Sequence, residues 1–154
     1  MSRAASLLVG GGADQLADVV TRLRRALRRG TRTTFPSESL PMAQVELLQQ
    51  LAAQPGSRVN DLAADLRLAP NTVSTLLAQL SDAGMVQRSA DPADRRSRRL
   101  SLTGTGSHQL HAWQQAQQAM LARALGRIDP ADRAAVLLAL PALERLSIAL
   151  DHDI

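Results

Sequence analysis

Apolar side chains recur at helical spacing over most of this chain. In residues 13–30 they lie three and four positions apart, which predicts one stripe of an amphipathic helix. Gly30 is a stop signal for that helix, and a loop is expected at 31–39. Residues 1–12 have only a weak apolar run, which favours a flexible arm. The stripe consists of Leu16, Val19, Val20, Leu23 and Leu27.

The next segment predicts three helices separated by turn residues. One helix opens at Pro41 and closes near Gly56. A short helix near 60–66, starting at a good capping residue, is followed by a tight turn and a second helix over 70–83. Gly84 ends that helix in the left-handed conformation that glycine adopts cheaply. Two short helices across such a turn indicate a helix-turn-helix.

The helix over 70–83 has an apolar side and a short, polar side that is nearly uncharged until Asp82. Small amides and hydroxyls suit a helix that enters a major groove about 12 Å wide and bonds to base edges. The alternative is an ordinary amphipathic helix, but a solvated face usually carries Lys, Glu or Arg. The candidate base-reading residues are Asn71, Thr72, Ser74, Thr75 and Gln79.

Strand-like runs at 85–89 and 98–103 flank a turn, so the pattern continues as a hairpin. Thr103 can cap a long helix after it. A last helix starts with Asp129 and Pro130, and Pro141 is expected to kink it. The predicted fold is mainly α with a small β-hairpin: a winged helix-turn-helix between N- and C-terminal helices.

The distribution of charge along the chain indicates what kind of partner the protein binds. The 154 residues carry a net charge of +4, with 18 basic side chains against 14 acidic. All the basic residues are arginine, and they cluster at 22–32 and 88–99. Clustered arginine points to a polyanion. Aromatic residues make up only 1%, which argues against recognition by stacking on bases.

The sequence gives little support to thiol chemistry, membrane insertion, metal binding or enzymatic activity. The chain has no cysteine, so disulfides, thiolate metal sites and thiol-based sensing are excluded. No run approaches the roughly 18 apolar residues of a membrane span, and a cytoplasmic protein is expected. His108 and His111 share a helix face, but no nearby acidic pair completes a metal site. We expect neither an enzyme nor a bound cofactor.

The sequence resembles the MarR family of winged-helix transcription regulators over roughly residues 16–150. Residues 61–88, "DLAADLRLAPNTVSTLLAQLSDAGMVQR", resemble the family's helix-turn-helix. Residues 91–106, "DPADRRSRRLSLTGTG", resemble its wing, with an Asp-x-Arg-x-x-Arg signature and then Leu-Thr-x-x-Gly. Two departures are Ala69 and Pro41, which stand where relatives usually place Ser or Thr caps. The missing cap at Ala69 costs about 1 kcal/mol.

The resemblance implies a role for the wing. Its tip would reach a minor groove, whose negative potential attracts inserted arginine. Arg96 would be the inserting residue, Asp94 would hold neighbouring arginines, and Arg95 and Arg98 would clamp phosphates. The DNA-binding residues implied for the wing are Asp94, Arg95, Arg96, Arg98 and Arg99.

The implied protein is a homodimer that represses a palindromic double-stranded operator and is released by a small aromatic or phenolic ligand. Residues 41–102 would form the DNA-binding part of a single chain over 13–154, and 13–30 plus 103–151 the dimerisation part. Trp113 and Met120 are candidate pocket residues. The candidate interface residues are Leu16, Val20, Leu23, Leu27, Leu125, Leu137, Leu138, Leu143 and Leu146.

Two rival functions stay open at this stage. One is a metal-responsive regulator that uses His108 and His111. The other is a winged helix that binds protein and not DNA, against which the arginine-rich wing tip argues.

Overall fold

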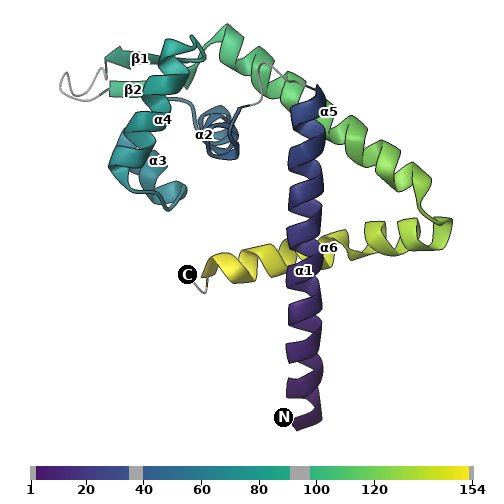
Figure 1. Ribbon diagram of the computed structural model, residues 1–154. Helices are drawn as coiled ribbons and strands as arrows, with labels where there is room; N and C mark the ends of the chain where they lie inside the picture. The colour runs from purple at the N-terminus through teal and green to yellow at the C-terminus, as the bar shows by residue number, and fades with distance from the viewer. Residues whose placement is uncertain (1–2, 35–39, 91–97, 153–154) are drawn as a thin grey trace. The chain divides into compact units, whose positions relative to one another are not determined.

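The computed structural model describes residues 3–34, 40–90 and 98–152 of the chain. Within these ranges it contains six helices and one two-stranded hairpin, which confirms the predicted fold class (Figure 1). The chain divides into two compact units, Met1–Ala116 and Gln117–Ile154, and each is described by itself. The elements are α1 (Arg3–Thr34), α2 (Met42–Ala53), α3 (Val59–Asp65), α4 (Pro70–Asp82), β1 (Val86–Ala90), β2 (Arg98–Leu102), α5 (Gly104–Arg127) and α6 (Pro130–His152).

Helix α1 is longer in both directions than the apolar stripe predicts. It begins at Arg3, inside the segment expected to be an arm, and continues past Gly30 to Thr34. A glycine inside a helix costs about 1 kcal/mol relative to alanine, which lowers helix stability without forbidding the helix. The alanines and leucines of residues 4–8 are good helix formers and offset part of that cost.

The apolar core lies in the winged helix. Val73, Leu77 and Leu80 of α4 have less than 2% of their surface exposed, as the helical spacing predicted. Leu110 is the one residue of α5 in the core cluster. None of the described residues of α1 or α6 belongs to it. The core residues are Val45, Leu47, Leu48, Leu51, Leu62, Ala63, Val73, Leu77, Leu80, Val86, Leu100 and Leu110.

Both helices of the helix-turn-helix end in the same backbone motif. After α3, the N–H of Leu68 donates to the Ala63 carbonyl at 2.9 Å and the N–H of Arg67 to the Ala64 carbonyl at 3.1 Å. After α4, the N–H groups of Met85 and Gly84 make the equivalent bonds, at 2.8 and 2.9 Å. This is the Schellman arrangement, which needs a left-handed residue. Gly84 supplies it with φ +68°, as predicted, whereas Arg67 takes it with φ +52°.

Replacing Arg67 by glycine is expected to raise the free energy of unfolding by about 1 kcal/mol, because a side chain in the left-handed region costs roughly 1–2 kcal/mol. Gly84→Ala is the matched opposite change. Its Cβ would meet nothing within 4 Å, so only backbone strain acts, and stability is expected to fall by about 1 kcal/mol. Urea titrations of both variants measure the effect. A destabilised Arg67→Gly protein would show that the arginine side chain contributes more than its strain costs.

The hairpin is antiparallel, with Val86 opposite Leu102 and Ala90 opposite Arg98. The connection between α2 and α3 pairs with the outer edge of β2: the N–H of Gly56 donates to the Leu100 carbonyl at 2.8 Å, and the N–H of Leu100 donates to the Ser57 carbonyl at 3.0 Å. The second strand of the hairpin is therefore joined to the α2–α3 connection through backbone hydrogen bonds.

A compact junction joins the end of α4 to the start of α5. The Thr103 hydroxyl donates to the Gly84 carbonyl at 2.6 Å and accepts the N–H of Gly106 at 3.0 Å, so Thr103 caps α5 as predicted. The Thr103 N–H donates to the Met85 carbonyl at 3.0 Å. These bonds give Thr103 and the buried Gly106 of the Leu-Thr-x-x-Gly pattern a structural role.

Helix α6 starts as predicted. The Asp129 carboxylate accepts the N–H of Ala131 at 2.8 Å, and Pro130 is the first residue of the helix. The helix continues through Pro141 to His152, and none of its described residues is buried. In the described part of the chain, no helix is long and apolar enough to cross a membrane.

Candidate nucleic-acid interface

The start of α4 lacks an ordinary cap. Ala69 holds the N-cap position and makes no side-chain hydrogen bond, and Pro70 follows it. The Asn71 Oδ1 accepts the N–H of Thr72 at 2.9 Å and so satisfies one of the free N–H groups of the first turn. Asn71 therefore takes over part of the role that serine or threonine at position 69 would have.

The polar face predicted for α4 is exposed. Asn71, Thr72, Ser74 and Thr75 lie on it, with no charged side chain before Asp82. The Thr75 hydroxyl donates to the Asn71 carbonyl at 3.0 Å, so the two residues form one polar group on adjacent turns. Its hydroxyl oxygen still has lone pairs that can accept a hydrogen bond. This face can both donate and accept hydrogen bonds across a groove.

Gln79 differs from the other four candidates. Its Oε1 accepts a hydrogen bond from Nε2 of Gln44 on α2, at 2.8 Å. Gln44 is only 8% exposed, so this is a partly buried polar link between α2 and α4. The two residues are 35 positions apart, and no local sequence signal could have found the link. Gln79 therefore holds the C-terminal half of α4 in place.

The wing is described only in its two strands. Asp94, Arg95 and Arg96 lie outside the described residues. Arg98 and Arg99 lie in β2, and both are exposed. The Nη1 of Arg99 donates to the Gly56 carbonyl at 3.3 Å, which ties the hairpin to the α2–α3 connection.

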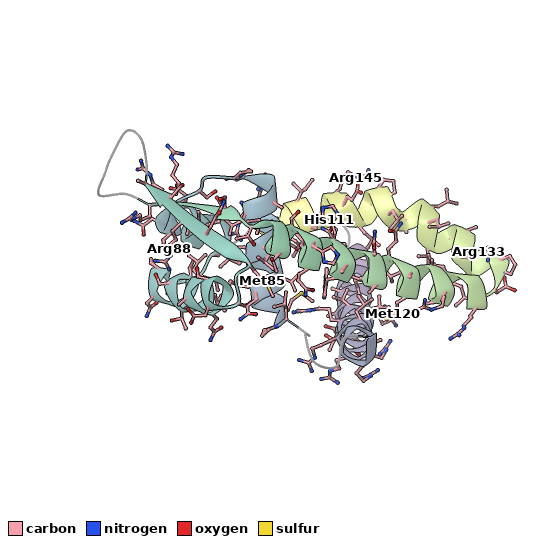
Figure 2. The ribbon with its side chains drawn as sticks, turned by 90° about the horizontal axis from the view of Figure 1, so that it is seen from above. Met85, Arg88, His111, Met120, Arg133 and Arg145 are labelled. Atoms are coloured by element: carbon pink, nitrogen blue, oxygen red, sulfur yellow. The ribbon has the colours of Figure 1, made fainter. Side chains whose placement is uncertain are left out.

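Arg88 belongs to the arginine cluster at 88–99 and is not among the DNA-binding residues predicted from the sequence. Arg88 is exposed on β1, directly opposite Leu100. Opposite residues of an antiparallel pair share a face, so Arg88 lies on the core-facing side of the hairpin, where Figure 2 labels it. The alternation of side chains along a strand places Arg88 on this face only when the pairing of β1 with β2 is known.

The remaining candidates lie on α5. Trp113 is half-buried and packs against the core cluster, which supports the structural role that its size suggests. Met120 is half-buried and His111 is exposed (Figure 2). Among the described residues, no three His, Asp or Glu side chains form a group that could hold a metal ion.

The candidate interface residues on α1, α5 and α6 are largely exposed. Leu23 has 55% of its surface exposed and Leu138 81%, while Leu27 and Leu125 are half-buried. Such stripes are uncommon on an isolated soluble chain and mark interaction surfaces. The exposed members are Leu16, Val20, Leu23, Leu137, Leu138, Leu143 and Leu146.

Comparison with known proteins gives a consistent result. A model of the MarR family matches residues 40–97. An uncharacterised HTH-type transcriptional regulator of Mycobacterium bovis and an HTH-type transcriptional regulator of Mycobacterium tuberculosis are each 30% identical over 121 residues, covering 79% of this chain and 82% of the relative.

Solved structures extend the likeness to almost the whole chain. A Pseudomonas aeruginosa protein described as a transcriptional regulator is 27% identical, with a TM-score of 0.77 over 96% of this chain and 98% of that one. A MarR family protein from Bacillus stearothermophilus is 19% identical, with a TM-score of 0.75 over 90% and 97%.

Proposed function

This chain belongs to the MarR family and is a DNA-binding transcriptional regulator, and from that premise we propose that it is a dimeric repressor of a palindromic operator. The observation that carries the proposal is the exposed, uncharged polar face of α4 on a helix whose other side is fully buried. A rigid helix with short amides and hydroxyls fits a major groove and discriminates bases there.

In the proposed complex, α4 reads base edges. Asn71 and Thr75 lie on adjacent turns, and Thr72 and Ser74 extend the same surface. Each good base contact contributes about 1–3 kcal/mol of discrimination. Gln79 is exposed, and its amide N–H groups stay available to a base edge while its oxygen accepts the hydrogen bond from Gln44.

In the same complex, the wing contacts the adjacent minor groove. Arg96 inserts into it, Asp94 orients neighbouring arginines, and Arg95 and Arg98 contact phosphates. Arg99 fixes the base of the wing through its bond to Gly56.

We assign dimerisation to the apolar stripes of α1 and α6. A dimer covers surface that these helices leave exposed, and it sets two copies of α4 about 34 Å apart, one helical turn of DNA. The family resemblance further suggests release by a small aromatic or phenolic ligand. A ligand acts in this way only if it favours a dimer with wrongly spaced recognition helices.

The rival functions have less support. The family and fold are those of transcription regulators rather than enzymes. A metal-responsive mechanism would need ligands beyond His108 and His111. A winged helix that binds only protein would leave the uncharged face of α4 and the arginines of the hairpin without a role.

Two alanine variants test the proposed interface. Arg96→Ala is expected to weaken operator binding at least tenfold, most strongly where the wing covers A·T-rich sequence, because a narrow minor groove concentrates negative potential. Thr75→Ala is expected to change base preference by about 1–3 kcal/mol at one position of each half-site. Mobility-shift titrations against a set of single-base operator variants measure both effects. Unchanged affinity for Arg96→Ala would contradict the wing assignment.

A further inference from the structure

Two arginines share one face of the hairpin. Alternation along β1 places Arg88 on the same side as the buried Val86, and Arg88 is directly opposite the buried Leu100. Alternation along β2 places Arg98 on that side as well. Arg88 and Arg98 are therefore diagonal neighbours, about 7–8 Å apart at the backbone and within reach of each other's side chains.

Neither side chain has a protein partner among the described residues. Both are exposed, because the apolar core ends at Val86 and Leu100 and the hairpin continues beyond it. Arg99 is different: it lies on the opposite face and bonds to Gly56. Like charges side by side on a sheet repel each other, and an anion bound between the two guanidinium groups would remove that repulsion.

The position of α4 indicates where such an anion would bind. The helix packs against β1, so the face that carries Arg88 and Arg98 is the face turned to the recognition helix. A DNA strand whose bases lie against α4 has its sugar-phosphate backbone along the rim of the major groove. Two guanidinium groups on a rigid strand pair match the oxygens of one phosphate.

We propose that Arg88 and Arg98 together bind one backbone phosphate of the operator, between the base contacts of α4 and the wing tip. This inference rests on the proposed function. The pair sets the register of the protein on the duplex and carries no sequence information. Phosphate binding also removes the repulsion between the two arginines.

The salt dependence of duplex binding tests the proposal. For one shared phosphate, the Arg88→Gln/Arg98→Gln double variant is expected to lower the slope of log affinity against log salt by about 0.9. Affinity at 0.1 M salt is expected to fall about tenfold, equally for operator and random duplex. Either single variant is expected to produce most of this loss, because the site needs both arginines.

Three outcomes overturn the phosphate site. An unchanged slope shows that no phosphate contact was lost, and a decrease of about 1.8 shows two separate contacts. A loss of affinity confined to certain base sequences shows that the pair reads bases. Failure of the unmodified protein to bind duplex DNA would instead contradict the proposed function and, with it, the site.

Matched variants separate this effect from net charge and folding. Arg123→Gln removes one exposed charge from α5, outside the winged helix, and is expected to leave the slope unchanged. An equal decrease in that variant would overturn the proposal. Arg88→Lys keeps the charge but not the fork, so it is expected to keep the slope and lose part of the affinity. Thermal unfolding of all variants is expected to match the parent, because these side chains are exposed.

Discussion

Gly106→Ala is expected to destabilise the winged helix by about 3 kcal/mol or more, enough to unfold much of the protein at moderate temperature. A Cβ on Gly106 would lie 2.0 Å from the carbonyl oxygen of Met85 and 2.9 Å from its carbonyl carbon. Both atoms belong to the backbone, so no rotation of a flexible side chain can remove the clash.

The surroundings leave the Met85 carbonyl little freedom to move. It accepts the N–H of Thr103 at 3.0 Å, and the Met85 N–H closes the motif at the end of α4. Thr103 is held in turn by its hydroxyl bonds to Gly84 and Gly106. A shift that made room for the new methyl group would break several of these bonds at once, and each contributes about 1 kcal/mol.

Gly104→Ala provides the matched control in the same helical turn. Its Cβ would meet nothing within 4 Å, and alanine is a better helix former, so stability is expected to stay equal or rise slightly. Thermal and urea unfolding of both variants measures the change in stability. A Gly106→Ala protein as stable as the parent would show that the close approach of α5 to Met85 is not required.

The second large expected effect is the loss of the dimer when apolar residues of α6 are replaced by glutamate. The Leu143→Glu/Leu146→Glu variant is expected to be a monomer at micromolar concentration and to bind its operator at least a hundredfold more weakly. These leucines are 44% and 39% exposed in the single chain and lie three residues apart on one side of α6. A carboxylate buried in an apolar interface costs several kcal/mol, so the dimer dissociates. Loss of the dimer removes the gain from binding two half-sites together.

Sedimentation and mobility-shift titrations measure the two parts of this prediction. Arg145→Glu is a charge-matched control, because it also changes the net charge by two units on the same helix. At 100° per residue it lies on a different side of α6 from the two leucines. This control is expected to remain a dimer. A dimeric double-glutamate variant would contradict the assignment of α6 to the interface.

Local signals in the sequence were sufficient for much of the site. The helices over residues 42–53, 59–65 and 70–82 follow from apolar spacing, proline at helix starts and Gly84 at a helix end. The caps Thr103 and Asp129 were also predictable. One detail was wrong: the short helix α3 begins at Val59, with Arg58 at its N-cap and not Asn60. Such boundaries depend on hydrogen bonds within three or four residues, such as that from the Arg58 N–H to Asp61.

The extent of α1 shows the limit of local signals. The weak apolar run of residues 1–12 predicted an arm and Gly30 predicted an early stop, yet the helix covers Arg3 to Thr34. Each glycine lowers helix stability by a modest amount, and single residues of this kind weaken a helix more often than they end it.

The tertiary structure alone decided the features that join distant residues. By itself, the sequence determined the helices of the winged helix, which face of α4 is polar and that the wing is rich in arginine. It contained no local sign that Gln44 binds Gln79, that Arg99 binds Gly56, or that Gly106 touches Met85. Helical spacing and capping act within one turn, so they can be recognised in a short stretch of sequence. Close approach between segments depends on how the whole core packs, and only the folded chain brings those atoms together.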